Sequence, residues 1–189
     1  MAAKNLFCVP LIRGEVPEDL SNRYWLEVGG QISRLERSFS QVKVCYHEAN
    51  YLAGEQGLKN LQRINEKSYQ LIKSRAEKEA RLEALEDKET FLEIADCQLF
   101  LTLRFSSKAV SEKTSKLNQE IYELYEKAIQ KRREYIPKQI SETLKDGETG
   151  VLMMREQERM KIQFPSEINV ILVRSPVLSE IEKWQRERK

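Results

Sequence analysis

The sequence predicts an α/β fold: a mainly parallel sheet of about four strands, flanked by helices. Two observations lead to this prediction. Short apolar or alternating runs with the length of strands begin at Leu6, Val42, Val151 and Ile168. Longer segments, with apolar residues at helical spacing, separate these runs. Because the first two predicted strands enclose one helix, they form a βαβ unit, in which the strands run parallel.

Length and composition indicate one globular domain, which we expect to span residues 1–189. The chain has 189 residues, of which 40% are hydrophobic and 33% charged, a composition typical of folded proteins. The net charge of +2 provides no general attraction to nucleic acid or anionic lipid. No apolar run approaches the roughly 18 residues that cross a bilayer, and the start of the sequence lacks the features of a signal peptide. We therefore expect a cytoplasmic protein without a membrane segment.

The three cysteines, Cys8, Cys45 and Cys97, are widely spaced and set in apolar surroundings. An odd number at irregular spacing does not suit a disulfide framework. We therefore expect reduced cysteines in the core of the domain.

The first predicted strand, Leu6–Ile12, contains Pro10, which cannot donate a hydrogen bond to a neighbouring strand. This strand is expected to lie at an edge, to contain a bulge, or to end early. A helix should follow, because apolar residues within 20–39 share one helical face and Pro17 suits a first helical turn. Alternating residues over Gln41–Glu48 predict the second strand.

The middle of the chain is predicted to be a helical insertion or protrusion over residues 57–136. From Gly57 to Phe105 the pattern predicts helix throughout, apart from a solvated turn or a break at Lys73–Lys78. A second long helix is predicted from Lys108 to Ile136. Its apolar residues fall near a heptad repeat: Val110, Leu117, Ile121, Leu124, Ala128 and Tyr135. Such a stripe packs either on the sheet or on another long helix.

In the last third of the chain, Pro137 is expected to end or bend the long helix, and Asp146-Gly147 to stop a short helix after it. Val151–Met154 and Ile168–Val173 are the remaining predicted strands. The second of these is almost entirely β-branched and apolar, which predicts a central strand covered on both faces. Ser175-Pro176 is a typical start for the final helix.

His47 and Glu48 are the candidates for catalytic residues. His47, the only histidine, ends the second predicted strand, next to Glu48. Parallel sheets bind ligands at the carboxyl ends of their strands, where a histidine can act as a general base. The alternative is a structural or surface histidine. One histidine and one glutamate are too few for a zinc site, and no motif indicates a metal or a cofactor.

Arg13 and Glu15, after the first strand, and Arg155, Glu156 and Arg174, after the third and fourth, are the candidates for ligand binding. If the strands are parallel, these side chains converge on one edge of the sheet. Guanidinium groups bind carboxylates and phosphates through two parallel hydrogen bonds. The alternative is that strand ends are polar only because the chain emerges into solvent there.

The densest basic cluster is a candidate for contact with nucleic-acid phosphates. It comprises Lys127, Lys131, Arg132, Arg133 and Lys138. Glu126 and Glu134 interrupt it, and cations near a helix C-terminus also stabilise the helix, so nucleic acid is not the favoured partner. The acidic run Glu83–Asp87 is interpreted as the solvated face of a helix.

The sequence contains no familiar catalytic loop. Gly54–Gly57 lacks the lysine and hydroxyl of a phosphate-binding loop, and no serine or cysteine stands in a nucleophile elbow. The leading hypothesis is a non-catalytic binding or regulatory module that acts through its helical surface, as a homodimer or with another protein. A small-molecule enzyme with a strand-end pocket and an RNA- or ribosome-associated protein are the alternatives.

Ile140–Met154, followed by Ile168–Val173, resembles the helix, turn and strand that open the C-terminal domain of Pelota-like and eukaryotic-type release factors. The resemblance is confined to residues 140–173 and includes no catalytic motif of that family. It implies an α/β module that binds ribosome-associated partners, without a peptide-release activity.

Overall fold

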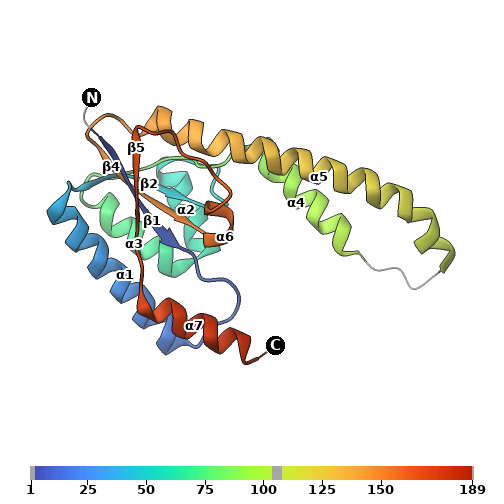
Figure 1. Ribbon diagram of the computed structural model, residues 1–189, viewed down its shortest axis with the longest axis horizontal. Helices are drawn as coiled ribbons and strands as arrows, with labels where there is room; N and C mark the ends of the chain where they lie inside the picture. The colour runs from blue at the N-terminus through green and yellow to red at the C-terminus, as the bar shows by residue number, and fades with distance from the viewer. Residues whose placement is uncertain (1–2, 104–107, 189) are drawn as a thin grey trace.

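The predicted α/β class with a parallel sheet is confirmed. The computed structural model describes residues 3–103 and 108–188, with the side chains of 108–112 left out of the description. Within these residues, five parallel strands form one sheet in the order β3-β2-β4-β1-β5 (Figure 1). The strands are β1 (Lys4–Pro10), β2 (Val42–His47), β3 (Arg81–Leu82), β4 (Thr149–Met154) and β5 (Ile168–Leu172).

Helices cover both faces of this sheet. The helices are α1 (Glu18–Ser38), α2 (Gly54–Ile64), α3 (Glu66–Ala76), α4 (Lys88–Thr102), α5 (Lys108–Thr143), α6 (Glu156–Arg159) and α7 (Pro176–Arg186). Phe7 and Val9 of β1 pack with residues of α1, α2, α3 and α7 in one core. Leu6 and Cys8 pack with the C-terminal part of α5 in a second core on the other face. This division follows from the alternation of side chains along a strand.

The central strand is β4, whose six residues are all buried. The expectation that the β-branched run at Ile168–Val173 is central is wrong: β5 lies at the edge, pairs only with β1, and is half-exposed along most of its length. Pro10 is the last residue of β1, beyond the point where pairing with β5 stops at Cys8. The expected early end is therefore the alternative that the structure adopts, and a proline there interrupts no ladder.

The segment predicted to be helical from Gly57 to Phe105 contains an additional strand. Helix α3 ends at Ala76, within the predicted break, and Arg81–Leu82 then pairs with β2 as β3. Two residues are too few to produce a periodic pattern, so the sequence could not reveal this strand. The Arg81 guanidinium holds it in place through ion pairs with Glu83 at 3.2 Å and Glu148 at 2.7 Å.

Helices α4 and α5 form a hairpin that extends away from the sheet, as Figure 1 shows at the right. We call this hairpin, residues 88–102 with 113–135, the helical arm. A small core of Ile94, Ala128 and Ile129 holds its two helices together. Among the described residues, no helix has the combination of length and apolar character that crossing a membrane requires.

Helix α5 continues through Pro137 to Thr143, so it ends later than predicted. A proline inside a helix costs about 3 kcal/mol or more. Ile136, Ile140 and Leu144 are fully buried against the sheet on either side of it. This apolar contact outweighs the missing hydrogen bond, and one continuous helix therefore joins the arm to the sheet.

All three cysteines are buried and unpaired, as the prediction of core cysteines requires. Burial raises the pKa of the Cys8 thiol to about 12 and that of Cys45 to about 12. Since only the thiolate reacts, the native thiols of Cys8 and Cys45 should react with a disulfide reagent at pH 8 about a hundredfold or more slowly than in urea.

Cys97 serves as the internal comparison for this experiment, because it lies in the helical arm, whose core is much smaller. It should be modified first. Mass spectrometry of the labelled peptides distinguishes the three sites, and rapid native labelling of Cys8 would contradict the burial described here.

Candidate functional site

The carboxyl ends of β1 and β4 lie next to each other, and the chain leaves them in opposite directions. The connection after β1 leads to α1, on the face of the first core. The connection after β4 leads through α6 to Ile162, which is packed in the second core. Such a point, where neighbouring strands have connections on opposite faces, is where parallel α/β sheets form a ligand-binding crevice.

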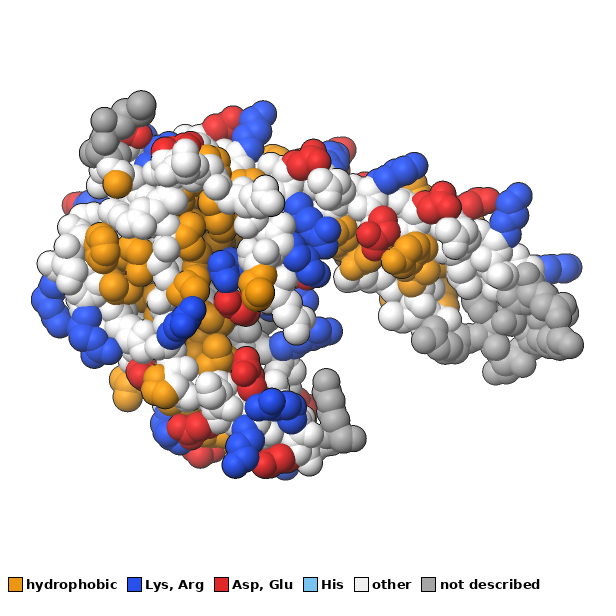
Figure 2. Space-filling model, viewed as in Figure 1, with side chains coloured by type: hydrophobic (Ala, Val, Ile, Leu, Met, Phe, Trp, Pro, Cys, Tyr) orange, Lys and Arg blue, Asp and Glu red, His pale blue; other side chains and the backbone are white. Residues whose placement is uncertain are grey.

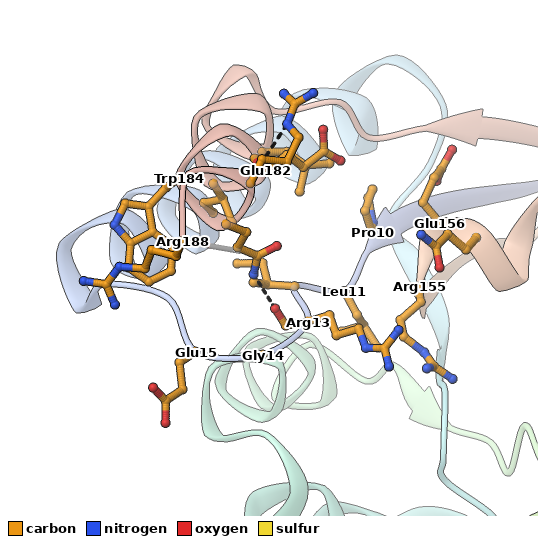
Figure 3. A pocket seen from close by; sticks show the side chains of 16 residues that line it. Pro10, Leu11, Arg13, Gly14, Glu15, Arg155, Glu156, Glu182, Trp184 and Arg188 are labelled. Atoms are coloured by element: carbon orange, nitrogen blue, oxygen red, sulfur yellow. Dashed lines mark hydrogen bonds between the residues drawn. The ribbon is translucent and has the colours of Figure 1, made fainter. Parts of the chain in front are cut away.

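A groove of about 810 Å³ lies at this point (Figure 3). We call it the strand-end groove. The chain after β1, the chain after β4 and one side of α7 form its walls. Its volume lies within the roughly 300–1,000 Å³ that small-molecule sites occupy. Its apolar wall includes Pro10, Leu11, Ile12, Leu178, Ile181 and Trp184.

Four of the five residues that the sequence proposed for ligand binding line this groove: Arg13, Glu15, Arg155 and Glu156. The fifth, Arg174, lines a smaller adjoining pocket of about 220 Å³, which shares Pro10 and Glu156 with the groove. The predicted convergence of strand-end side chains therefore has a counterpart in space.

The side chains of the groove differ in how far they are already neutralised. Arg155 forms an ion pair with Glu48, and Glu156 pairs with Arg159 at 2.8 Å. Arg188 lies 4.2 Å from the ring centre of Trp184, in a cation–π contact. Arg13 is exposed, and its guanidinium has no ion-pair partner in the part of the chain that the structure describes.

His47 is buried and is not among the residues of either pocket. Its Nδ1 contacts the carbonyl oxygen of Glu48 at 2.5 Å, and its Nε2 contacts the Ser68 hydroxyl at 2.9 Å. Since a carbonyl oxygen can only accept, Nδ1 carries the proton and Nε2 accepts from Ser68. Burial lowers the pKa of His47, more than the nearby Glu48 raises it. The ring is thus a neutral structural group with both nitrogens occupied.

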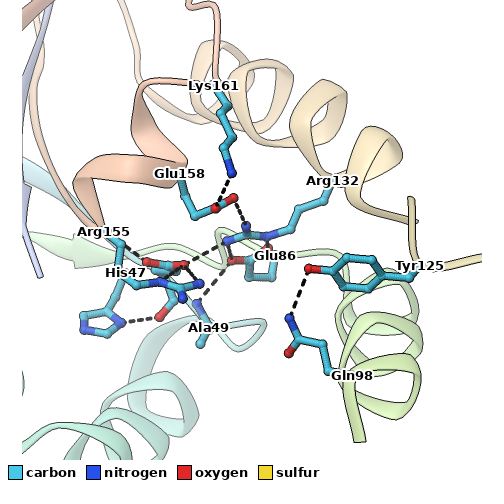
Figure 4. Close-up of polar contacts among 10 residues, drawn as sticks. His47, Ala49, Glu86, Gln98, Tyr125, Arg132, Arg155, Glu158 and Lys161 are labelled. Atoms are coloured by element: carbon cyan, nitrogen blue, oxygen red, sulfur yellow. Dashed lines mark hydrogen bonds and ion pairs between the residues drawn. The ribbon is translucent and has the colours of Figure 1, made fainter. Parts of the chain in front are cut away.

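The Glu48 carboxylate is also fully engaged, in a network of charged side chains whose members Arg132, Arg155, Glu86 and Glu158 are labelled in Figure 4. Its Oε2 accepts from the backbone N of Arg155 at 2.8 Å, and its Oε1 accepts from Nε and Nη2 of Arg155 at 2.8 and 2.5 Å. On the other side, Nη2 of Arg132 lies 3.5 Å from Oε1. Glu48 therefore links β2, β4 and α5 instead of facing a substrate.

Arg132 is the centre of this network. It donates to Glu86 at 2.6 and 2.8 Å, and lies 3.6 Å from Glu158, which Lys161 contacts at 2.9 Å. Burial alone would lower the pKa of Arg132. The hydrogen bonds to Glu86 and its negative charge raise the pKa by more than burial lowers it, so the net shift is upward. Arg132 is therefore a buried cation compensated by three glutamates, as such a charge requires.

The basic cluster does not form one surface patch. Arg132 is buried in the network, whereas Lys127 and Lys131 are exposed to solvent. Arg133 has its Nε buried without a hydrogen-bond acceptor among the described residues, and Lys138 pairs loosely with Glu142 at 3.9 Å. Consecutive helical positions point in different directions, which is why a cluster in sequence is divided in space.

Glu86 and Glu158 are site residues that the sequence did not reveal. The interpretation of Glu83–Asp87 as a solvated helix face is wrong, because Glu86 is buried in the loop between β3 and α4, and Asp87 caps α4. Asp87 accepts from the backbone N of Thr90 at 2.9 Å, the geometry of an N-cap. An acid three residues before a threonine could have suggested this cap, but nothing local marks Glu86 as the partner of a distant arginine.

The helical arm carries exposed apolar side chains on both of its helices. These are Leu92 and Leu99 on α4, and Leu117, Tyr122 and Leu124 on α5; Leu103, directly after α4, is exposed as well. Figure 2 shows hydrophobic side chains on the visible face of the arm, between charged ones. Of the predicted heptad stripe, Ala128 is buried against α4 while Leu117 and Leu124 remain exposed, and the side chain of Val110 lies outside the described residues.

Fold and site together define a parallel α/β protein with a groove at its strand ends and a projecting helical arm. In residues 3–103 and 108–188, no group of three or more histidine, cysteine or acidic side chains is arranged to hold a metal ion. Comparison of the chain with protein-family models, with curated proteins and with solved structures finds no match.

The buried state of His47 predicts a pH dependence of stability. Because its pKa is lowered from 6.5 in the folded protein, the unfolded state binds more protons in acid, and stability falls as the pH drops below about 6.5. The free energy of unfolding in urea should therefore decrease from about pH 7.5 to about pH 5. His47→Gln should be less stable at neutral pH, but should lose less of its stability over this range. An equal loss in both proteins would contradict a buried neutral imidazole.

The charge network predicts a strongly non-additive pair of substitutions. Arg132→Met should destabilise the fold by about 3–5 kcal/mol, because it leaves the buried carboxylate of Glu86 without its cation. Adding Glu86→Gln should restore part of this loss. Lys131→Met, the exposed neighbour on the same helix, should change stability by no more than about 0.5 kcal/mol. Urea unfolding of Arg132→Met, Glu86→Gln, the double variant and Lys131→Met tests this, and additive losses in the two single variants and the double variant would exclude the coupling.

Proposed function

We propose that this protein is a non-catalytic binding module that acts through its helical arm, and that its partner there is a second copy of the chain. The observation that carries this proposal is the set of leucines exposed on the arm. Monomeric proteins seldom expose large apolar patches, which more often mark sites of protein association.

The spacing of these leucines suits a further helix. Leu92 and Leu99 are seven residues apart on α4, and Leu99 is 67% exposed. They lie on the side of α4 opposite Ile94 and Cys97, which face the interior of the arm. On α5, Leu117 and Leu124 are again seven residues apart. A seven-residue apolar repeat forms a seam for another helix.

The charges on the two helices favour contact between unlike helices of two copies. The exposed surface of α4 carries Glu89, Glu93 and Asp96 against one lysine, Lys88. On α5, the exposed residues from Lys113 to Lys131 inclusive contain four lysines and three glutamates, a small excess of positive charge. If α4 of one copy lies on α5 of the other, a twofold axis repeats the same contact. The resulting dimer would pack its two arms as four helices, with the charged side chains of α4 and α5 facing each other around the apolar contact.

The two alternative functions receive less support. A strand-end enzyme that uses His47 and Glu48 would need these side chains at a pocket, yet both are buried and fully bonded. Contact with RNA through the basic cluster would need a continuous patch, yet Arg132 is buried and compensated by acids.

Leu99→Glu should convert the dimer into a monomer, since the substitution places a charge at the centre of the apolar seam. Stability of the monomer should change little, because Leu99 is largely exposed within one chain. Leu26→Glu, on α1 and away from the arm, is the matched control, because Leu26 is 80% exposed. Analytical ultracentrifugation over the micromolar range measures the outcome.

The wild-type protein and Leu26→Glu should sediment as dimers, and Leu99→Glu as a monomer. A wild-type monomer throughout this range, or a dimer that survives Leu99→Glu, would overturn the proposal.

A further inference from the structure

We propose that the strand-end groove binds a small organic anion, with its carboxylate or phosphate between Arg13 and Arg155 and its apolar part against the wall that includes Trp184. This site is separate from the helical arm, and the proposal does not depend on dimer formation. Four features of the groove support it.

The first feature is position. The groove opens at the point where the chain leaves β1 and β4 towards opposite faces of the sheet. In open parallel sheets, ligands bind in the crevice outside the carboxyl ends of the strands at such a point. The fold thus leaves a concave site at this edge.

The second feature is an arginine whose charge is available. The Arg13 guanidinium is exposed at the groove and has no ion-pair partner in the described residues. The loop that carries it is held in place, because its backbone carbonyl accepts a hydrogen bond of 2.5 Å from the Gln185 side chain of α7. Figure 3 shows the Arg13 and Arg155 side chains extending from the ends of neighbouring strands towards the same side of the groove. An oxyanion between them would satisfy both.

The third feature is that Arg155 is held in a fixed orientation. Its Nε and Nη2 both donate to Oε1 of Glu48, which leaves Nη1 unoccupied within the described part of the chain. The Arg155 side chain is nevertheless 43% exposed. A guanidinium fixed on one edge by a buried carboxylate presents its remaining donors without further loss of side-chain freedom. Arg155 can therefore add a directed hydrogen bond to a ligand that Arg13 attracts.

The fourth feature is the composition of the remaining wall, which limits the ligand class. Leu11, Leu178 and Trp184 provide apolar surface for a hydrocarbon or aromatic group. Glu15 and Glu182 also line the groove, together with Arg186 and Arg188, and the two carboxylates repel a second anionic group placed beside them. The geometry therefore favours a ligand with one anionic end and an apolar body over a polyanion such as nucleic acid.

Amide and indole NMR of the 189-residue chain labelled with ¹⁵N tests this proposal. The chain has two tryptophans, so the spectrum of Trp184→Phe assigns the Trp184 indole signal. Benzoate and phenyl phosphate are titrated separately at constant ionic strength, with inorganic phosphate and sodium chloride as reference titrations. We expect saturable shifts at Trp184 and at residues 11–15 with at least one of the two organic anions, and the stronger of the two identifies the anionic group.

Arg13→Ala should weaken this binding by about tenfold or more, as the loss of a hydrogen-bonded charge does. Arg34→Ala, which removes an exposed arginine from α1 outside the groove, should leave binding unchanged. Both variants should retain the wild-type pattern of unperturbed signals, which verifies the fold.

Three results would overturn the proposal. One is the absence of saturable shifts at Trp184 up to millimolar benzoate and phenyl phosphate. Another is an equal effect of the two arginine substitutions, which would indicate a response to net charge alone. The third is inorganic phosphate binding as tightly as phenyl phosphate, with benzoate inactive, because the apolar wall would then contribute nothing.

Discussion

The Glu48 carboxylate, shared between Arg155 and Arg132, is the interaction on which the arrangement of this protein depends. One of its partners forms a wall of the strand-end groove, and the other belongs to α5, the helix that carries the arm. Removing two or more charges from water is costly, and only close pairing with further hydrogen bonds compensates for it. The additional contacts of Arg132 with Glu86 and Glu158 provide this compensation. The network consequently fixes β2, β4 and α5 relative to one another.

The direction of the crossovers determines what surrounds this network. Parallel strands are joined by right-handed connections. When the next strand is added in the opposite direction along the sheet, the connecting helix therefore lies on the opposite face. The chain runs towards β3 through α1, α2 and α3, and then returns through the long α5 to β4 at the centre. This reversal produces both features that concern function: a crevice between β1 and β4, and two long helices that leave the sheet together.

The sequence was informative where a pattern is local and repeated. The strands at Val42 and Val151, the helix over residues 20–39 and the cap at Ser175 all follow from periodicity or end signals. Three features depend on tertiary contacts and could not be predicted. The two-residue β3 has no period, the apolar β5 lies at an edge because the chain order places it there, and Pro137 is tolerated because its neighbours are buried.

For the groove, position after a strand suggested Arg13 and Arg155, but not Trp184, which α7 brings back to the same edge. The resemblance at residues 140–173 concerns parts of the sheet body and the end of α5, and remains a prediction.

The unbroken course of α5 through Pro137 has a mechanical consequence. From Arg132 to its start at Lys108 the helix is about 36 Å long, at about 1.5 Å per residue. A rotation of about 5° at Arg132 would displace the far end of this rod by about 3 Å. Arg132 and Arg155 hold the same carboxylate, so the helix that carries the arm and the wall of the groove share one charged contact. Any tilt of α5 at this contact would therefore move the tip of the arm much further than the residues at the groove.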